Sequence, residues 1–360
     1  MTSRSVTLED VAKLAGVSYQ TVSRVLNHSA KVSAATREKV SAAMLQLNYV
    51  PNRVAQQLAG KATRSIGLAT TDLMLLAPAQ IASAIQHRAA ALGYQLVIAM
   101  ADLPGFPSAQ AAVNDLLAQR VDGLLLNLPL QNDEALALDK LTGQLPCLFM
   151  DVASDATVNR CQFSASEGAR QGVEHLYALG HRQIALINGP LTSVSAMQRF
   201  QAWQRALAGY QLAPHSVHQG DWSAQSGYQA VRSLLPDNLP TALLVANDQM
   251  ALGAMRALHQ HGIRIPQQIS VVGYDDTAES AWYQPPLTTI RQDIRLLGQQ
   301  SVDCLVAAMQ SQQGEQLAPL ATELVVRETT ASVDQGADIR EVADQLASLA
   351  QQLRRLKIKP

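Results

Sequence analysis

The chain of 360 residues is 48% hydrophobic and 16% charged, which is typical of a globular protein with two or three domains. The first ten residues lack the apolar stretch of a signal peptide, and no apolar run reaches the roughly 18 residues of a membrane helix, so we expect a cytoplasmic protein. The cysteines Cys147, Cys161 and Cys304 lie far apart, which predicts neither a disulfide framework nor a zinc finger.

Charge is distributed unevenly along the chain. The net charge at pH 7 is only −1, but residues 1–63 carry eight Lys or Arg against three Asp or Glu, a balance of +5 that leaves −6 for the rest. A basic module on an acidic body suits binding to a polyanion, because Lys and Arg displace the counterions condensed on phosphates. A solvated charged surface explains the same imbalance, so charge alone does not decide.

Residues 7–15 have the pattern of a short amphipathic helix. Thr7 can cap this helix, and Asp10 completes a capping-box pattern three residues later. Gly16 can adopt the backbone angles of the tight turn that follows. The apolar side chains that recur at helical spacing are Leu8, Val11, Ala12 and Ala15.

A second helix is expected over residues 19–26 with Ser18 as its cap, and a third helix begins near Ser33. Helix, glycine turn, helix and supporting helix make the helix-turn-helix arrangement, whose second helix enters the major groove of DNA. A three-helix bundle with an ordinary polar surface is the alternative interpretation. The inward-facing residues are Val22, Val25 and Leu26 of the second helix and Val40, Met44 and Leu47 of the third.

The second helix carries side chains that suit base recognition. Gln20 can pair with adenine and Arg24 with guanine, and both lie away from the apolar face, beside Tyr19 and Ser23. Phosphate oxygens can be bound by the helix N-terminus and by the side chains of Thr7, Ser18 and Asn27.

From Arg64 onward, short apolar runs alternate with segments of helix length. Continuous apolar runs of this kind indicate parallel strands buried on both faces, so we predict an α/β fold with doubly wound parallel sheets. About ten strands are too many for one small lobe, and the break after Val152 indicates two lobes, with the LTTIRQD region crossing back to the first. The runs are SIGLAT, YQLVIAM, DGLLLNL, LPCLFMDV, QIALINGP, TALLVAND, ISVVGYDD and LTTIRQD.

Polar residues end these apolar runs, and ligands of such sheets bind beyond the carboxyl ends of the strands. Carboxylates and amides can hold sugar hydroxyls, Arg199 offers a forked donor, and Trp222 offers a flat face for a pyranose ring, so the set suits a neutral polyol. Each position is equally well explained as a turn or helix-cap residue. The run-ending residues are Asn127, Asp151, Asn247, Asp248, Asp275, Asp276 and Gln292.

An enzyme and a transport-type binding protein are the rival classes. The sequence contains no nucleophile elbow, no P-loop and no dinucleotide-binding glycine motif after a strand, and its scattered histidines lack further metal ligands. We therefore predict no catalytic residue, no cofactor and no metal site. A transport-type binding protein explains the core but needs an export signal and leaves residues 1–63 without a role.

Sequence blocks along nearly the whole chain resemble the lactose-repressor family of bacterial regulators. The resemblance implies a helix-turn-helix headpiece over 1–50, a hinge helix over 51–62 and a core over 63–332 similar to the periplasmic sugar-binding proteins. Its lobes are expected at about 63–162 with 293–320, and 163–290 with 321–331. The blocks are VTLEDVAKLAGVSYQTVSRVLN, VSAATREKV, LNYVPNRVAQQLAGK, FMDV, SAMQRFQAW, GDWS, VANDQMALGAMRA, SVVGYDDT and PPLTTIRQD.

The resemblance implies that Tyr19, Gln20 and Arg24 read bases and that Leu58 enters the minor groove as an apolar wedge when the hinge folds on DNA. Because the hinge segment is too short for a stable isolated helix, a plain linker is its alternative. Lys31 departs from the family pattern, which has histidine there. The other expected DNA-binding residues are Thr7, Ser18, Ser23, Asn27, Lys31, Ser33, Thr36, Tyr49, Asn52 and Gln56.

The same blocks imply an inducer site in the core. Thr71 stands where the family has serine and Ile294 where it has an aromatic residue, which bears on inducer preference. The implied polar contacts come from Asn127, Asp151, Ser195, Arg199, Asn247, Asp275 and Gln292, with Trp222 stacking on the sugar. The implied pocket walls are Ile81, Phe163, Ile294 and Leu297.

The function implied by the resemblance is repression of a lactose or galactoside operon by a nucleoid-associated protein. A dimer binds palindromic double-stranded operator DNA, and a galactoside inducer releases it. A related repressor that responds to a different sugar is the alternative.

The tail over residues 338–360 carries an apolar seam at alternating steps of three and four, the a and d positions of a coiled coil. A helix docked on its own core and a self-associating helix both explain the seam. The resemblance implies that the tail joins two dimers into a homotetramer. The seam consists of Ile339, Val342, Leu346, Leu349, Leu353 and Leu356.

Overall fold

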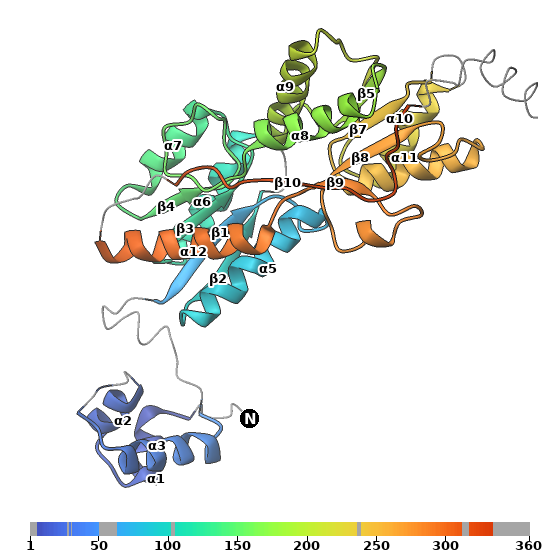
Figure 1. Cartoon of the computed structure of the whole chain (residues 1–360). Coiled ribbons are helices and arrows are strands. Elements are labelled where there is room, and N and C mark those ends of the chain that lie inside the picture. Colours follow the sequence, from blue (N-terminus) through green and yellow to red (C-terminus); the bar gives the residue numbers. More distant parts are fainter. Residues whose placement is uncertain are drawn as a thin grey trace, which may run out of the picture. The chain divides into compact units, whose positions relative to one another are not determined.

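The structure is a computed structural model that describes residues 6–26, 29, 31–49, 63–101, 105–235, 239–311 and 317–333. The chain divides into two compact units, Met1–Thr63 and Arg64–Pro360 (Figure 1). The expected hinge helix and the expected oligomerisation tail lie outside the described residues, as do the side chains of Asn27, Asn52, Gln56 and Leu58.

The first unit contains three helices, α1 (Leu8–Ala15), α2 (Tyr19–Leu26) and α3 (Ala34–Gln46). Their apolar faces meet in one small core, as the helical spacing of the apolar residues predicts. The buried residues of this core are Val11, Ala12, Val22, Val25, Val40 and Ala43. The predicted helix-turn-helix headpiece is confirmed.

Each helix of the headpiece begins at the hydroxyl residue that the sequence predicts. Thr7 forms a capping box with Asp10, and the side chains of Ser18 and Ser33 each accept a hydrogen bond from the backbone N–H three residues later. Gly16 ends α1 with φ 68°, a left-handed conformation that costs glycine little. Local sequence therefore fixes both ends of α1 and the start of the following helices.

The second unit contains two sheets. The sheet of the first lobe has the order β2-β1-β3-β4, and all of its strand pairs are parallel. Its strands are β1 (Ser65–Thr70), β2 (Gln95–Met100), β3 (Gly123–Asn127) and β4 (Cys147–Phe149). Apolar side chains pack on both faces of this sheet, under α5 (Leu76–Ala91) and α12 (Ile294–Ser311) on one face and under α6 (Phe106–Ala118) and α7 (Asn132–Thr142) on the other.

The sheet of the second lobe has the order β10-β9-β8-β7-β5-β6. Its strands are β5 (Ile184–Asn188), β6 (Val217–Gln219), β7 (Ala242–Val245), β8 (Ser270–Asp275), β9 (Thr288–Arg291) and β10 (Glu323–Val325). Its helices are α8 (Ala165–Ala178), α9 (Val194–Gly209), α10 (Ala224–Leu234), α11 (Asp248–Gln260) and the 3-10 helix η1 (Ser280–Trp282). One large hydrophobic cluster fills this lobe, with the fully buried Trp203 among its members.

Three segments of chain connect the two lobes. The first leads from β4 to α8, and Phe163 within it forms a parallel bridge with Leu320 of the third segment. The second segment leaves the second lobe after β9 and enters α12, which packs against α5 and β3 of the first lobe. The chain then returns to the second lobe as β10. Figure 1 shows α12 beside the first sheet although it follows strands of the second.

The prediction of an α/β core with doubly wound sheets is confirmed, and each of the eight apolar runs contains a strand. Two further strands, β6 and β10, include polar or charged residues and therefore form no continuous apolar run. β10 pairs antiparallel with β9, so the second sheet is not wholly parallel. None of the described helices combines the length and the apolar character that crossing a bilayer requires.

Close packing of α10 against α11 gives a test of this fold. A Cβ atom at Gly253 would overlap the carbonyl oxygen of Ala224, whereas a Cβ at Gly209 would meet nothing within 4 Å. Gly253→Ala should therefore lower the free energy of unfolding by about 1–3 kcal/mol. Gly209→Ala, the matched control, should cause no loss, because alanine is the better helix former. Urea unfolding followed by circular dichroism measures both, and equal stability of the two variants contradicts the packing.

Candidate functional site

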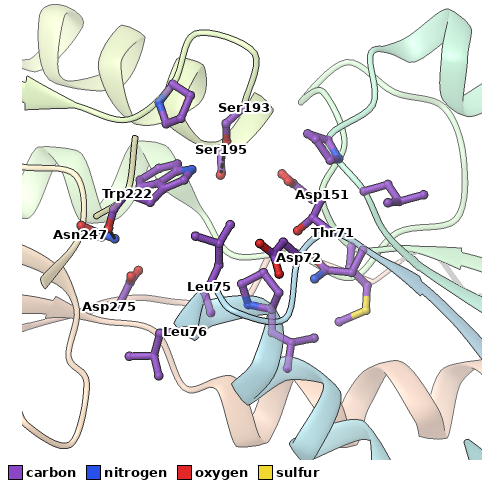
Figure 2. A pocket seen from close by; sticks show the side chains of 18 of the residues that line it. Thr71, Asp72, Leu75, Leu76, Asp151, Ser193, Ser195, Trp222, Asn247 and Asp275 are labelled. Carbon is purple, nitrogen blue, oxygen red and sulfur yellow. Dashed lines mark hydrogen bonds between the residues drawn. The ribbon is translucent and has the colours of Figure 1, made fainter. Parts of the chain in front are cut away.

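A cavity of about 790 Å³ lies between the two lobes, at the carboxyl ends of strands from both sheets. Thr71, Asp72 and Asp151 line it from the first lobe, and Trp222 and Asp275 are among the residues that line it from the second (Figure 2). A space of this size accommodates a small-molecule ligand. Because both lobes form the walls, the cavity allows a ligand to contact both of them.

Arg199 of α9 is the centre of the polar wall. Its side chain is only 7% exposed, and its Nη1 donates to the carbonyl oxygen of Ala246, just after β7. Its Nη2 donates to Oδ1 of Asp275 at 3.2 Å and to Oε1 of Gln292 at 3.0 Å. The guanidinium also lies over the ring of Tyr274, 3.9 Å from the ring centroid. One buried cation therefore connects the ends of β7, β8 and β9.

Two carboxylates in the cavity are harder to ionise than usual. Burial raises the pKa of Asp275, while the Arg199 charge opposes this effect. Burial also raises the pKa of Asp151 to about 6, against the lowering effects of Arg199 and of a backbone hydrogen bond from Ser195. Buried carboxylate oxygens need hydrogen-bond donors, and the hydroxyl groups of a neutral ligand can supply them.

Trp222 forms a flat apolar part of the same wall. Its backbone has φ 76°, and its carbonyl oxygen accepts a hydrogen bond from Nδ2 of Asn247 at 3.0 Å. Its indole occupies the space beside Gly189, where a Cβ atom would overlap the ring. Asn247 also caps α11 by accepting a hydrogen bond from the N–H of Met250 at 2.8 Å. Glycine and a side-chain cap thus hold the tryptophan in place.

The first lobe supplies a more apolar wall. Asn127, which is 8% exposed, donates from Nδ2 to Oγ1 of Thr70 at 3.3 Å. Before α5, the apolar residues Leu73 and Leu75 line the cavity together with Asp72, and sequence reasoning did not identify these three. An apolar run at the start of a helix predicts burial in a core, so only the position of Asp72 directly after the β1 region signalled this part of the site.

The structure brings the predicted inducer residues together around this one cavity. Their contacts with a sugar stay a prediction. All twelve line the cavity: Ile81, Asn127, Asp151, Phe163, Ser195, Arg199, Trp222, Asn247, Asp275, Gln292, Ile294 and Leu297. Thr71 also lines it.

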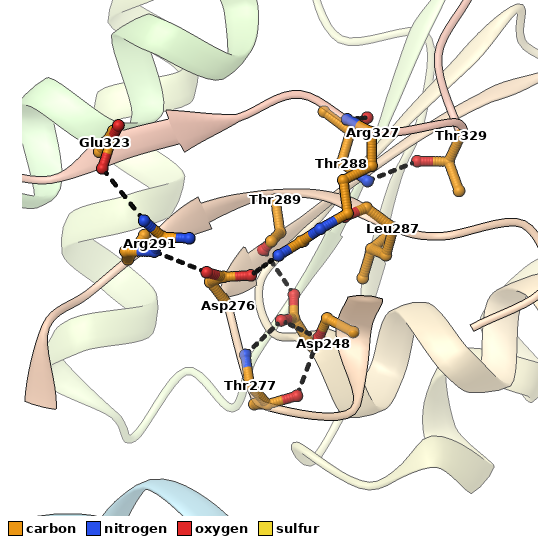
Figure 3. A network of polar contacts seen from close by, with 11 residues as sticks. Asp248, Asp276, Thr277, Leu287, Thr288, Thr289, Arg291, Glu323, Arg327 and Thr329 are labelled. Carbon is orange, nitrogen blue, oxygen red and sulfur yellow. Dashed lines mark hydrogen bonds and ion pairs between the residues drawn. The ribbon is translucent and has the colours of Figure 1, made fainter. Parts of the chain in front are cut away.

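Two residues that sequence reasoning placed in the site lie outside the cavity. Asp248 is fully buried and accepts hydrogen bonds from Oγ of Ser280 at 2.5 Å, from Oγ1 of Thr289 at 2.6 Å and from the N–H of Thr277 at 3.0 Å (Figure 3). It is the first residue of α11, so its side chain turns away from that of the capping Asn247. The prediction that Asp248 belongs to the ligand site is therefore wrong.

Asp276 is the second correction. Its side chain is 7% exposed and pairs with Nε of Arg291 at 2.7 Å and with Nη2 of Arg327 at 2.5 Å (Figure 3). Asp275 lines the cavity and Asp276 pairs with these arginines, so the two neighbouring acids lie in different surroundings.

In the headpiece, the predicted base-reading residues are accessible. Tyr19 is 53% exposed, and Gln20 and Arg24 are exposed on the same helix, whose opposite face is buried. Thr7, Ser33 and Thr36 take part in helix capping, so their hydroxyls have structural hydrogen bonds besides any phosphate contact. Tyr49 packs against the headpiece core and is partly buried.

No group of His, Cys, Asp and Glu in the described ranges could hold a metal ion. Cys147 and Cys161 are buried and Cys304 is partly exposed, and all three are free thiols.

A helix-turn-helix headpiece ahead of a two-lobed core with a polar cavity between its lobes defines a bacterial regulatory protein with a ligand-binding core. Residues 7–52 match the lacI family of bacterial regulatory proteins, and residues 173–330 match the periplasmic binding protein-like domain. The chain belongs to the lacI family.

Individual relatives match nearly the whole chain. The lactose operon repressor of Escherichia coli (strain K12) is 53% identical over 98% of this chain and 99% of its own length. In the crystal structure of the lac repressor dimer bound to operator and the anti-inducer ONPF, the protein chain is 53% identical in sequence to this one. The match has a TM-score of 0.86 and covers 91% of this chain and 100% of that chain. A crystal structure of the lac repressor bound to ONPG in the repressed state gives 54% identity and the same TM-score, over 91% of this chain and 100% of that chain.

The pH dependence of stability tests the hydrogen-bond network around the buried Asp248. Burial raises its pKa to about 6, so the folded protein keeps this proton over a pH range in which the unfolded chain, with a pKa near 3.8, has lost it. Stability should therefore fall as pH rises from about 4 to about 6. In Asp248→Asn this fall should be smaller, because the amide does not titrate and the neighbouring hydroxyls can accept as well as donate. Urea midpoints at pH 4.5, 5.5 and 6.5 measure the difference, and parallel pH profiles contradict it.

Proposed function

We propose that the chain represses an operon for the use of lactose or another galactoside and leaves its operator when a galactoside fills the core cavity. The observation that carries this proposal is the joining of a helix-turn-helix headpiece to a cavity whose polar wall is built around Arg199. Its support is the similarity, over nearly the whole chain, to the lactose operon repressor and to lac repressor structures with operator and with ONPG.

DNA recognition is assigned to the exposed side of α2. Tyr19, Gln20 and Arg24 read base edges in the major groove, and the other predicted headpiece contacts bind the backbone. Two headpieces of a homodimer read the two halves of a palindrome. The hinge over 51–62 folds on the DNA and places Leu58 in the minor groove.

Ligand recognition is assigned to the polar wall of the cavity. Asp275, Arg199 and Asn247 form hydrogen bonds with sugar hydroxyls, and Trp222 stacks on the apolar face of the ring. Asp151 and Asn127 bind the same ligand from the first lobe. Because the ligand contacts both lobes, it stabilises one arrangement of the lobes over another, and this difference in contacts is what shifts the protein away from operator binding.

The division of the chain follows the same reasoning: headpiece over 1–50, hinge over 51–62, core over 63–332 and tail over 338–360. We infer that the tail joins two dimers into a tetramer, which allows one molecule to hold two operators. The protein acts on DNA in the cytoplasm, and the proposed function requires neither a catalytic step nor a cofactor.

The DNA assignment predicts loss of sequence preference in α2 variants. Gln20→Ala and Arg24→Ala should each weaken binding to the cognate operator by about 1–3 kcal/mol and relax the preference at one base pair per half-site. Gln46→Ala, an exposed change on α3 outside the predicted contacts, should bind as the wild type does. Gel-shift titrations on operator and random DNA measure both effects. An equal loss on both DNAs would show that these residues do not read bases.

The ligand assignment predicts repressors that no longer respond to sugar. Arg199→Ala and Asp275→Asn should keep operator affinity but lose release by galactosides, because the ligand loses the hydrogen bonds to the centre of the polar wall of the second lobe. Arg205→Ala, on the exposed side of the same helix α9, should respond normally. Operator release is followed with a panel of galactosides and glucosides. Normal release of both cavity variants refutes the site, and release of the wild type by a glucoside alone favours a regulator of a different sugar.

A further inference from the structure

The polar network beside the cavity contains Asp276, a charged residue that does not line the cavity itself. The side chain of Asp276 is only 7% exposed and pairs with two arginines from different segments, Arg291 at the end of β9 and Arg327 just after β10 (Figure 3). Arg327 also donates from Nη1 to the carbonyl oxygen of Leu287 at 2.7 Å and from its backbone N–H to Oγ1 of Thr288 at 2.9 Å. One carboxylate therefore ties together the turn after β8, the end of β9 and the chain after β10.

Two of these places, the end of β9 and the chain around β10, adjoin the connections to the first lobe. The chain after β9 leads through Gln292 into α12 of the first lobe, and the chain returning from α12 becomes β10. The side chain of Asp276 is 7% exposed and that of Arg327 17%, whereas Arg291 is 44% exposed, so the Arg327 pair is the more buried of the two. A mostly buried charge that loses its partner is strongly unfavourable. The Asp276 pairs thus fix two connecting segments against the edge of the cavity.

The backbone at this point also needs such support. Asp275 has φ 113° and Asp276 has φ 56°, so two consecutive residues other than glycine lie at positive φ. Conformations of this kind persist only where surrounding contacts hold them. Here the holding contacts are the two ion pairs of Asp276 and the hydrogen bond from the N–H of Thr277 to Asp248.

Asp275 and Gln292, the two side chains that accept hydrogen bonds from Arg199, flank this network in the sequence. Asp275 precedes Asp276, and Gln292 follows Arg291, while the N–H of Gln292 donates to the carbonyl oxygen of Asp275 at 3.2 Å. Both side chains then accept hydrogen bonds from the same Nη2 of Arg199. A shift of the Asp276–Arg291 pair would move both acceptors relative to the guanidinium.

We propose that Asp276 is a positioning residue for the ligand site: its ion pairs with Arg291 and Arg327 hold Asp275 and Gln292 in the geometry in which they and Arg199 bind the sugar. The proposal rests on the proposed function and adds to it a residue outside the cavity that sets ligand affinity. Its physical basis is preorganisation, since binding residues held in place need no ordering when the ligand arrives.

Asp276→Asn is the direct test, because asparagine tolerates positive φ as aspartate does, removes the charge and replaces one of the two acceptor oxygens by an NH2 group. Calorimetric titration of the full chain with a galactoside such as isopropyl thiogalactoside should show about a tenfold rise in Kd. Arg291→Gln, which keeps the Arg327 pair and changes a side chain that is 44% exposed, should fold normally and raise Kd by about threefold. The matched control is Glu174→Gln, which removes an exposed ion pair with Arg170 in the same lobe and should leave Kd unchanged.

A second readout separates positioning from a merely structural role. If Asp276 acts through Gln292, the rise in Kd caused by Asp276→Asn should be smaller in a Gln292→Ala background than in the wild type. A structural role predicts the same factor in both backgrounds, and that result overturns the proposal.

Unchanged galactoside affinity in both Asp276→Asn and Arg291→Gln also overturns the proposal but leaves the proposed function intact. Failure of the wild-type protein to bind any galactoside contradicts the proposed function, and the inference falls with it. The two failures are thus distinguished by the wild-type titration alone.

Discussion

The buried guanidinium of Arg199 is the interaction on which the arrangement of the core depends. A cation that is 7% exposed is stable only with partners, and it finds them in Ala246, Asp275 and Gln292, at the ends of three different strands. The second sheet must place those strand ends together for the charge to be satisfied. The same arrangement leaves carboxylate and amide oxygens at the edge of a cavity, where a neutral polyol can complete their hydrogen bonds.

The cavity matters for regulation because its walls belong to two lobes joined by three connections. A ligand that contacts Asn127 or Asp151 together with Arg199 links the lobes, and the free energy of that link depends on how they are arranged. The Asp276 network lies where two connections reach the second lobe, so ligand geometry and lobe connection share one set of ion pairs.

Much of this architecture follows from local sequence. Hydroxyl caps and Gly16 define the headpiece helices, and long apolar runs define eight strands, because capping and burial are properties of short segments. β6 and β10 escaped prediction because each includes polar or charged side chains and so forms no continuous apolar run, unlike the equally short β4. Sequence reasoning placed both Asn247 and Asp248 in the ligand site, because both follow β7. Which of the two side chains faces the cavity depends on where α11 starts. Of the twelve predicted ligand residues, seven follow from the ends of the apolar runs and from side-chain chemistry, and the family resemblance added Ile81, Phe163, Ser195, Ile294 and Leu297.

The central claim is that the sugar and the operator are linked through one conformational equilibrium. Galactoside affinity should be measured by titration for the free protein and for the protein saturated with operator. Linkage requires the sugar to bind the operator complex more weakly, by the same factor by which the sugar weakens operator binding. That result is the one the account predicts. Equal galactoside affinity of the free and operator-bound protein would contradict it.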